Sequence, residues 1–122
     1  MSKHTCFDLF LELGMFSVLT FSIGSLWRDN LSLLLVVIVQ ALISLFFWHD
    51  RFDTSFFIVI TVFGTIAELV FVYFGVWQYA NPTSLGIPVW FPGAFGTAAL
   101  AAERLVRTIV GRYSSLQTSA RN

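Results

Sequence analysis

The sequence predicts an all-α integral membrane protein, a bundle of four spanning helices in up-and-down order. Of its 122 residues 57% are hydrophobic and 11% are charged, and the mean hydropathy is +0.78. Soluble domains do not have this composition. The apolar residues also form long runs with short polar links between them. Since about 20 apolar residues are enough for a helix to cross a bilayer, each run predicts one span.

The first two runs are joined by a short polar link. Residues 7–27 form a run of 21 residues, which is about 30 Å long as a helix. Asp8 and Glu12 interrupt this run and no small-residue cleavage site follows it, so we expect a retained helix and not a signal peptide. The link forces antiparallel neighbours, and Asn30 is placed to cap the second helix. That helix, residues 31–48, contains no charged residue.

The third predicted helix covers residues 54–77 and carries Glu68 as its only charged residue. Asp53 or Thr54 is placed to cap its first turn. A turn containing Asn81 and a proline follows this helix. The range 54–77 makes the third helix long enough to span the membrane with some tilt.

The fourth predicted helix covers residues 87–110, with Pro88 in its first turn, where a missing N–H is tolerated. Small residues recur along it at a spacing of four and predict close helix packing; they are Gly93, Thr97 and Ala101, and Ala94, Ala98 and Ala102. Residues 1–111 thus form one transmembrane domain. The serine-rich residues 112–122 lack apolar periodicity and predict a flexible cytoplasmic tail.

Charge placement predicts the orientation in the membrane. Four spans put both termini on one side, and that side would hold all the lysine and arginine residues except Arg28. We therefore expect cytoplasmic termini, in the inner (plasma) membrane of a bacterium. The formal net charge is zero, and without a basic patch nucleic acid is not an expected partner.

Glu68 is the first candidate for function, because an ionisable group inside an apolar helix is costly there. If Trp77 marks the outer interface, Glu68 lies roughly 13 Å inward. Gln40 on the second helix is the expected uncharged partner. Glu68 is then either a general acid, proton-coupling group or cation ligand, or a structural group that holds helices together. The predicted ligand-binding residues are Gln40, Thr61, Thr65, Glu68, Trp77, Tyr79 and Trp90, and Glu68 is the catalytic candidate.

A second set of charges lies near the predicted cytoplasmic side. Counting along the helices places Glu12 beside Arg104 and Asp8 beside Arg107 in depth. These residues would form a ladder of ion pairs, or alternatively a proton entrance that leads to Glu68.

Metal and cofactor chemistry has little support in the sequence. Cys6 is the one cysteine, and we expect it to be a filler residue. His4 and His49 lie at predicted membrane edges, where solvated side chains are more common than metal ligands. We therefore expect no metal site and no cofactor.

Residues 68–97 resemble a known pattern. It contains Glu68, Gly75, Trp77, Tyr79, the run Leu85-Gly86-Ile87-Pro88, and Pro92. This pattern is similar to one in membrane carotenoid hydratases and, more loosely, in integral-membrane lycopene cyclases. The resemblance implies an isoprenoid ligand and an acid role for Glu68. As a whole, the chain is also similar to small four-helix bacterial membrane proteins.

Three functions follow from these observations as expectations. The first is a membrane protein that binds an apolar lipid or isoprenoid, or that acts as an accessory subunit. The second is an isoprenoid-modifying enzyme with Glu68 as general acid. The third is a proton-coupled small exporter, for which Glu12 resembles by position the first-helix glutamate of small multidrug resistance exporters. The expected partners are membrane lipids and a second copy or larger complex, with the ligand in a groove between subunits along the small-residue face of 87–110.

Overall fold

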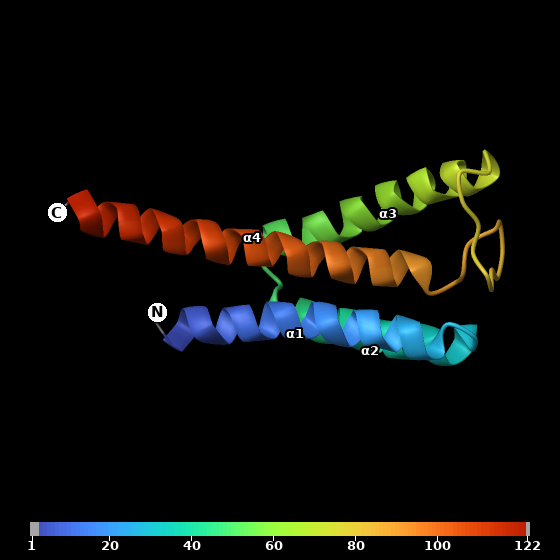
Figure 1. Ribbon diagram of the computed structural model, residues 1–122, viewed down its shortest axis with the longest axis horizontal. Helices are drawn as coiled ribbons and strands as arrows, with labels where there is room; N and C mark the ends of the chain where they lie inside the picture. The colour runs from blue at the N-terminus through green and yellow to red at the C-terminus, as the bar shows by residue number, and fades with distance from the viewer. Residues whose placement is uncertain (1–2, 122) are drawn as a thin grey trace.

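The structure, a computed structural model, describes residues 3–121; for Lys3 and residues 112–116 it describes the backbone only. The described chain is helical, which confirms the all-α prediction. Its elements are α1 (Lys3–Leu26), α2 (Asn30–Phe47), α3 (Arg51–Tyr73) and α4 (Phe91–Arg121). The helices alternate in direction, so that both termini lie at one end, the termini end (Figure 1). The α1–α2 link and the α3–α4 loop lie at the other end, the loop end.

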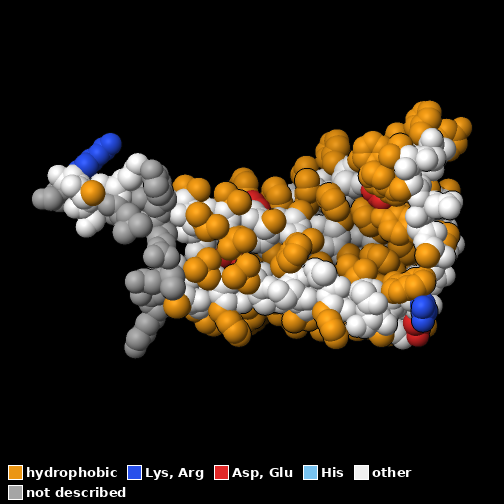
Figure 2. Space-filling model, in the orientation of Figure 1, with side chains coloured by type: hydrophobic (Ala, Val, Ile, Leu, Met, Phe, Trp, Pro, Cys, Tyr) orange, Lys and Arg blue, Asp and Glu red, His pale blue; other side chains and the backbone are white. Residues whose placement is uncertain are grey.

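Three of these helices are long and apolar enough to cross a membrane. These segments are His4–Leu26, Asn30–Phe47 and Arg51–Tyr73. Large hydrophobic side chains cover much of the face seen in Figure 2, as they do on proteins whose surface meets lipid. The composition is thus that of a membrane protein, and the fourth span, α4, stays a prediction.

Helix α4 is the central element of the fold. It packs against each of the other three helices, while α1 and α2 also pack against each other. Helix α3 packs on the side of α4 away from α1 and α2, and it diverges from α4 toward the loop end (Figure 1). One buried cluster joins Leu19, Leu33, Val37, Trp90 and Ala94, and a second, toward the termini end, joins Trp48, Leu100 and Ala101.

The small residues of α4 allow this central position, as predicted. A Cβ atom on Gly93 would lie 2.9 Å from Cγ1 of Val37 on α2, and one on Gly96 would overlap Thr61 on α3. Thr97 and Ala101 are buried. Around these residues the face is therefore filled by the chain's own helices. The ligand groove expected between subunits along this helix stays a prediction.

The two predicted helix ends that flank the α3–α4 loop differ from the structure by four residues each. Helix α3 ends at Tyr73 and not at residue 77, because Gly75 takes a left-handed conformation with φ 76° and reverses the chain. Helix α4 begins at Phe91 and not at residue 87. Its first turn contains Pro92, whereas Pro88 lies in the preceding loop.

The caps of α2 and α3 are the aspartates just before them. Asp29 accepts a hydrogen bond from the backbone N–H of Ser32, and Asp50 accepts one from that of Asp53. The predicted caps, Asn30 and Asp53 (or Thr54), are wrong by one to four residues. The side chains of Asn30 and Asp53 make contacts with other elements instead.

The backbone of α4 continues as a helix to Arg121, where a flexible tail was predicted from residue 112. Residues 112–121 contain neither proline nor glycine, so nothing in their backbone chemistry ends the helix. The side chains of residues 112–116 lie outside the described part of the chain.

Two arginines of α4 form ion pairs with the start of α3. Arg104 Nη1 lies 3.1 Å from Asp53 Oδ2, and Arg107 Nη2 lies 3.4 Å from Asp53 Oδ1. Asp53 is only 1% exposed. Asp50 completes the cluster, with its Oδ2 3.4 Å from Arg107 Nη1. These contacts hold α3 against α4 at the end where the two helices do not diverge.

The predicted pairing of Glu12 with Arg104 and of Asp8 with Arg107 is therefore wrong. Both arginines are engaged by the α2–α3 connection and the first turn of α3. Glu12 instead accepts a hydrogen bond of 2.6 Å from the hydroxyl of Thr108 on α4.

Candidate ligand-binding site

The Glu68 carboxyl accepts two hydrogen bonds from the loop that follows its own helix. Trp77 Nε1 and Tyr79 Oη each donate to Glu68 Oε1 at 2.6 Å. The predicted separation of about 13 Å between Trp77 and Glu68 is wrong, because the chain folds back after Gly75. The side chain of Glu68 is almost buried, at 9% exposed, and it lies five residues before the last residue of α3.

Tyr79 links the carboxyl to the aromatic residues at the start of α4. Its ring meets Trp90 edge to face, with centroids 6.4 Å apart, and also contacts Phe91. Burial, with the hydrogen bond to Glu68, raises the pKa of the Tyr79 phenol above its usual value. The phenol therefore stays neutral, as a donor to Glu68 requires.

Two asparagines fasten this loop to the α1–α2 link. Asn30 Nδ2 donates to the carbonyl of Asn81 and to Thr83 Oγ1, both at 3.0 Å. Asn81 Nδ2 donates to the carbonyls of Trp27 and Arg28, both at 3.1 Å. Sequence reasoning missed both asparagines as positioning residues. The available signal was that each stands in a turn next to aromatic residues.

Asn30 also positions Trp90. Its Oδ1 accepts a hydrogen bond of 3.0 Å from Trp90 Nε1, and Trp90 is only 7% exposed. A buried indole N–H needs such a partner, so this bond fixes the ring against which Tyr79 packs.

The loop narrows to a two-residue turn at Leu85 and Gly86. Ser84 and Ile87 exchange both backbone hydrogen bonds, at 3.1 and 3.2 Å. The residues between them have φ of 54° and 85°, as a tight hairpin turn requires. For leucine this conformation costs about 1 kcal/mol or more. The turn presents Leu85, which is 80% exposed, toward α3.

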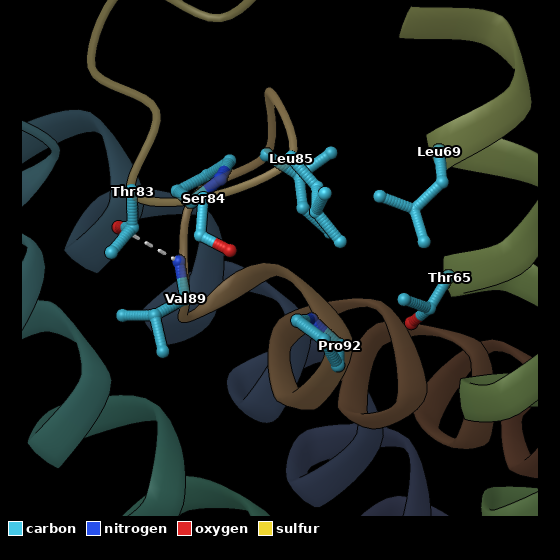
Figure 3. A pocket seen from close by; sticks show the side chains of 9 residues that line it. Thr65, Leu69, Thr83, Ser84, Leu85, Val89 and Pro92 are labelled. Carbon is cyan, nitrogen blue, oxygen red and sulfur yellow. Dashed lines mark hydrogen bonds between the residues drawn. The ribbon is translucent and has the colours of Figure 1, made fainter. Parts of the chain in front are cut away.

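A cavity of about 250 Å³ lies between this loop, α3 and the start of α4. Leu85 from the loop and Leu69 from α3 face one another across it, and Thr65 and Pro92 lie below them (Figure 3). Its walls are mostly apolar; the lining residues are Thr65, Leu69, Thr83, Ser84, Leu85, Ile87, Pro88, Val89 and Pro92.

One buried hydroxyl on the cavity wall has no hydrogen-bond partner among the described residues. Thr83 Oγ1 accepts hydrogen bonds from Val89 N–H, at 3.1 Å, and from Asn30. Thr65 Oγ1, in contrast, is buried and has no hydrogen-bond partner among the described residues. Unpaired buried hydroxyls are costly, so the mostly apolar cavity wall contains one buried hydroxyl that a bound group could pair with.

The structure brings four of the predicted residues together and separates the others from them. Glu68, Trp77 and Tyr79 share hydrogen bonds, and Tyr79 contacts Trp90. Thr65 lines the neighbouring cavity.

Thr61 and Gln40 lie elsewhere. Thr61 faces Gly96 in the α3–α4 contact. Gln40 Nε2 donates to Ser22 Oγ at 3.0 Å, between α2 and α1. The expected pairing of Gln40 with Glu68 is therefore wrong. The reason is that α3 packs on α4 and not on the α1–α2 side of the bundle.

The described residues contain no group of three histidine, cysteine, aspartate or glutamate side chains that could hold a metal ion. Comparison with protein families, with well-characterised proteins and with solved structures finds no match to this chain.

Proposed function

We propose that the protein is an integral membrane protein that binds an apolar ligand, a lipid or an isoprenoid chain, in the cavity at the loop end. All four helices span the membrane in this proposal. Both termini face the cytoplasm of a bacterial cell, because lysine and arginine gather at the termini end. The loop end then faces outward, and the cavity lies at the outer side of the membrane.

The observation that carries the proposal is the composition of the cavity wall. Apolar side chains surround one buried hydroxyl that has no partner among the described residues, that of Thr65. Ligand sites commonly combine an apolar surface with a few polar groups that fix orientation. A chain of methyl and methylene groups fits the walls, and a hydroxyl or carbonyl on that chain would pair with Thr65.

The loop supports the proposal through its strain and its anchors. Leu85 occupies a left-handed conformation that leucine disfavours, and strained residues gather at binding sites. The hydrogen bonds from Trp77 and Tyr79 to Glu68 hold the loop over the end of α3. The Glu68 carboxyl thus helps to hold in place the loop that forms one wall of the cavity.

A second candidate function is an isoprenoid-modifying enzyme with Glu68 as general acid. The hydrogen bonds from Trp77 and Tyr79 both go to Oε1 of Glu68. This favours the candidate, because the other oxygen, Oε2, receives neither bond and is available to carry a proton. The resemblance of residues 68–97 to carotenoid hydratases points the same way. In this candidate Tyr79 is a positioning residue, because it acts by orienting the carboxyl.

The exposed face of α3 is proposed as the surface toward lipid, a second copy or a larger complex. It carries large apolar side chains along its length; these include Ile58, Val62, Phe63, Ile66 and Val70. An accessory role within a complex would use this face.

Mass spectrometry of co-isolated lipids tests the binding proposal. Protein purified in a mild detergent should carry one lipid or isoprenoid enriched over the membrane extract. Thr65→Val keeps the side-chain shape and removes the hydroxyl, so it should reduce this enrichment severalfold. Thr61→Val is the matched control, because its hydroxyl is also buried without a partner among the described residues but lies outside the cavity. Equal lipid profiles in the wild type, both variants and the bulk membrane would refute the proposal.

A further inference from the structure

A second cavity lies on the opposite half of the molecule, between α1 and α4. Its volume is about 310 Å³, and it is lined by Glu12, Leu13, Phe16, Ala101, Ala102 and Leu105. Glu12 is the only charged side chain among the described residues of this lining. It lies nine residues after the first residue of α1, which is about 13 Å along the helix axis.

The Glu12 carboxyl is buried and incompletely paired. Glu12 is 2% exposed, and its Oε2 has no hydrogen-bond partner among the described residues. Its other oxygen, Oε1, faces Thr108 Oγ1 at 2.6 Å, but that hydroxyl also lies 3.0 Å from the carbonyl of Arg104. A hydroxyl has a single proton, so it cannot donate fully to both acceptors.

The surroundings of Glu12 have a surplus of negative charge. Asp8, Arg104 and Glu103 all act on the Glu12 charge, but Arg104 directs its Nη1 to Asp53 and Asp50. Glu103 has a second buried oxygen without a partner among the described residues, Oε2. Five carboxylates thus stand against two guanidinium groups in this cluster: Asp8, Glu12, Glu103, Asp50 and Asp53 against Arg104 and Arg107.

We propose that the α1–α4 cavity binds a single-chain alkylammonium compound, with its N–H donors on the Glu12 carboxylate and its chain against Leu13, Phe16 and Leu105. An ammonium group supplies three donors and one positive charge, which matches the unpaired acceptors and the charge surplus. Inside a membrane no bulk water is present to meet Glu12, so a buried acceptor must find its donor in a ligand or in protein. The cavity volume suits one chain and not the two chains of a phospholipid.

Binding of radiolabelled dodecylamine to the protein in phosphatidylcholine nanodiscs tests this proposal. Phosphatidylcholine has no N–H donor, so it does not compete for Glu12. Glu12→Gln keeps the shape and removes the charge, and it should weaken dodecylamine binding roughly tenfold or more. Asp29→Asn is the control, because it removes a carboxylate at the loop end, far along the molecule from Glu12, and asparagine keeps the capping role of Asp29. It should leave binding within about twofold.

Three further binding measurements identify what occupies the α1–α4 cavity. Ala102→Leu fills the cavity from an exposed position without touching the carboxyl, and it should also abolish binding. Dodecyltrimethylammonium has the charge but no N–H donor, and it should bind more weakly than dodecylamine. Binding should persist in phosphatidylethanolamine nanodiscs; its loss there would mean that a lipid headgroup occupies the site.

Two other results would overturn the proposal. One is equal binding of dodecylamine to the wild type and to Glu12→Gln. The other is no binding to the wild type together with dissociation of an oligomer by Glu12→Gln, which would place the missing donor on a second copy. Circular dichroism of each variant in nanodiscs establishes that the helices are retained.

Discussion

Asp53 is the residue whose loss should destabilise the protein most clearly. Its carboxylate is 1% exposed and contacts two guanidinium groups, those of Arg104 and Arg107, at 3.1 and 3.4 Å. The change Asp53→Asn keeps the side-chain shape, removes the negative charge and leaves both arginines facing each other. The contact between the start of α3 and α4 should therefore weaken.

The size of this effect follows from the exposure of the partners. Breaking a fully buried ion pair costs about 3 to 5 kcal/mol, and an exposed pair contributes under about 1 kcal/mol. The side chains of Arg104 and Arg107 are 24% and 35% exposed, so solvent relieves part of the cost. We expect Asp53→Asn to lower the free energy of unfolding by about 2 to 3 kcal/mol.

Equilibrium unfolding in mixed detergent micelles, followed by circular dichroism, measures this change. Asp50→Asn is the matched control, because Asp50 is 54% exposed and asparagine keeps its capping role. It should cost much less. The double change Asp53→Arg with Arg104→Asp should recover part of the stability lost in each single variant. A loss in Asp53→Asn no larger than that in Asp50→Asn, or no recovery in the double variant, would refute the assignment of the pair.

Three further predictions follow from the loop end and the α3–α4 contact. The pKa of Tyr79 is raised, so Tyr79→Phe should remove from an absorbance titration a tyrosine that ionises above the usual pH for tyrosine, which is about 10. The stabilising effect of Tyr79 is present below about pH 10 and is lost as the pH rises past its folded pKa. An unchanged titration curve would contradict this. Gly64→Ala should cost about 1 to 3 kcal/mol, because the added methyl would overlap the ring of Phe95, which stacks on Phe91; thermal melting equal to the wild type would show that the ring moves freely. A reporter fused to the C-terminus should read cytoplasmic and one inserted at residues 81–84 should read external, whereas two cytoplasmic signals would exclude four spans.

Much of the helical arrangement could be predicted from hydropathy and residue size. Long apolar runs give helices in any lipid-facing chain, and the spacing of Gly93, Thr97 and Ala101 indicated where another helix packs closely. The helix ends were less predictable. Gly75 reverses the chain at a left-handed φ, and a glycine in an apolar run does not by itself reveal whether a helix continues or ends there.

Ion-pair partners could not be chosen from depth alone. Counting residues places both Glu12 and Asp53 near the level of Arg104, and only the packing of α3 on α4 decides between them. The same limit applies to Gln40. It was placed at a depth close to that of Glu68, but it lies on a helix that packs on the other side of α4.

The candidate site was predicted in part, for a physical reason. Glu68 stood out because carboxyl groups are rare in apolar helices, and Trp77 and Tyr79 because aromatic residues with polar tips gather at membrane edges. Their hydrogen bonds to Glu68 depend on a loop that folds back and is held by Asn30 and Asn81. Those two contacts join residues more than 50 positions apart, which no local pattern encodes.

Photo-crosslinking at Leu85 tests the central claim, ligand binding at the loop end, most directly. Leu85 lines the cavity, so photo-leucine at this position should attach to one lipid or isoprenoid of defined mass when cells are irradiated. Photo-leucine at Leu42, which is 64% exposed on α2 and outside the cavity, should attach to the bulk lipids in proportion to their abundance. The same bulk lipid profile at both positions would contradict the claim.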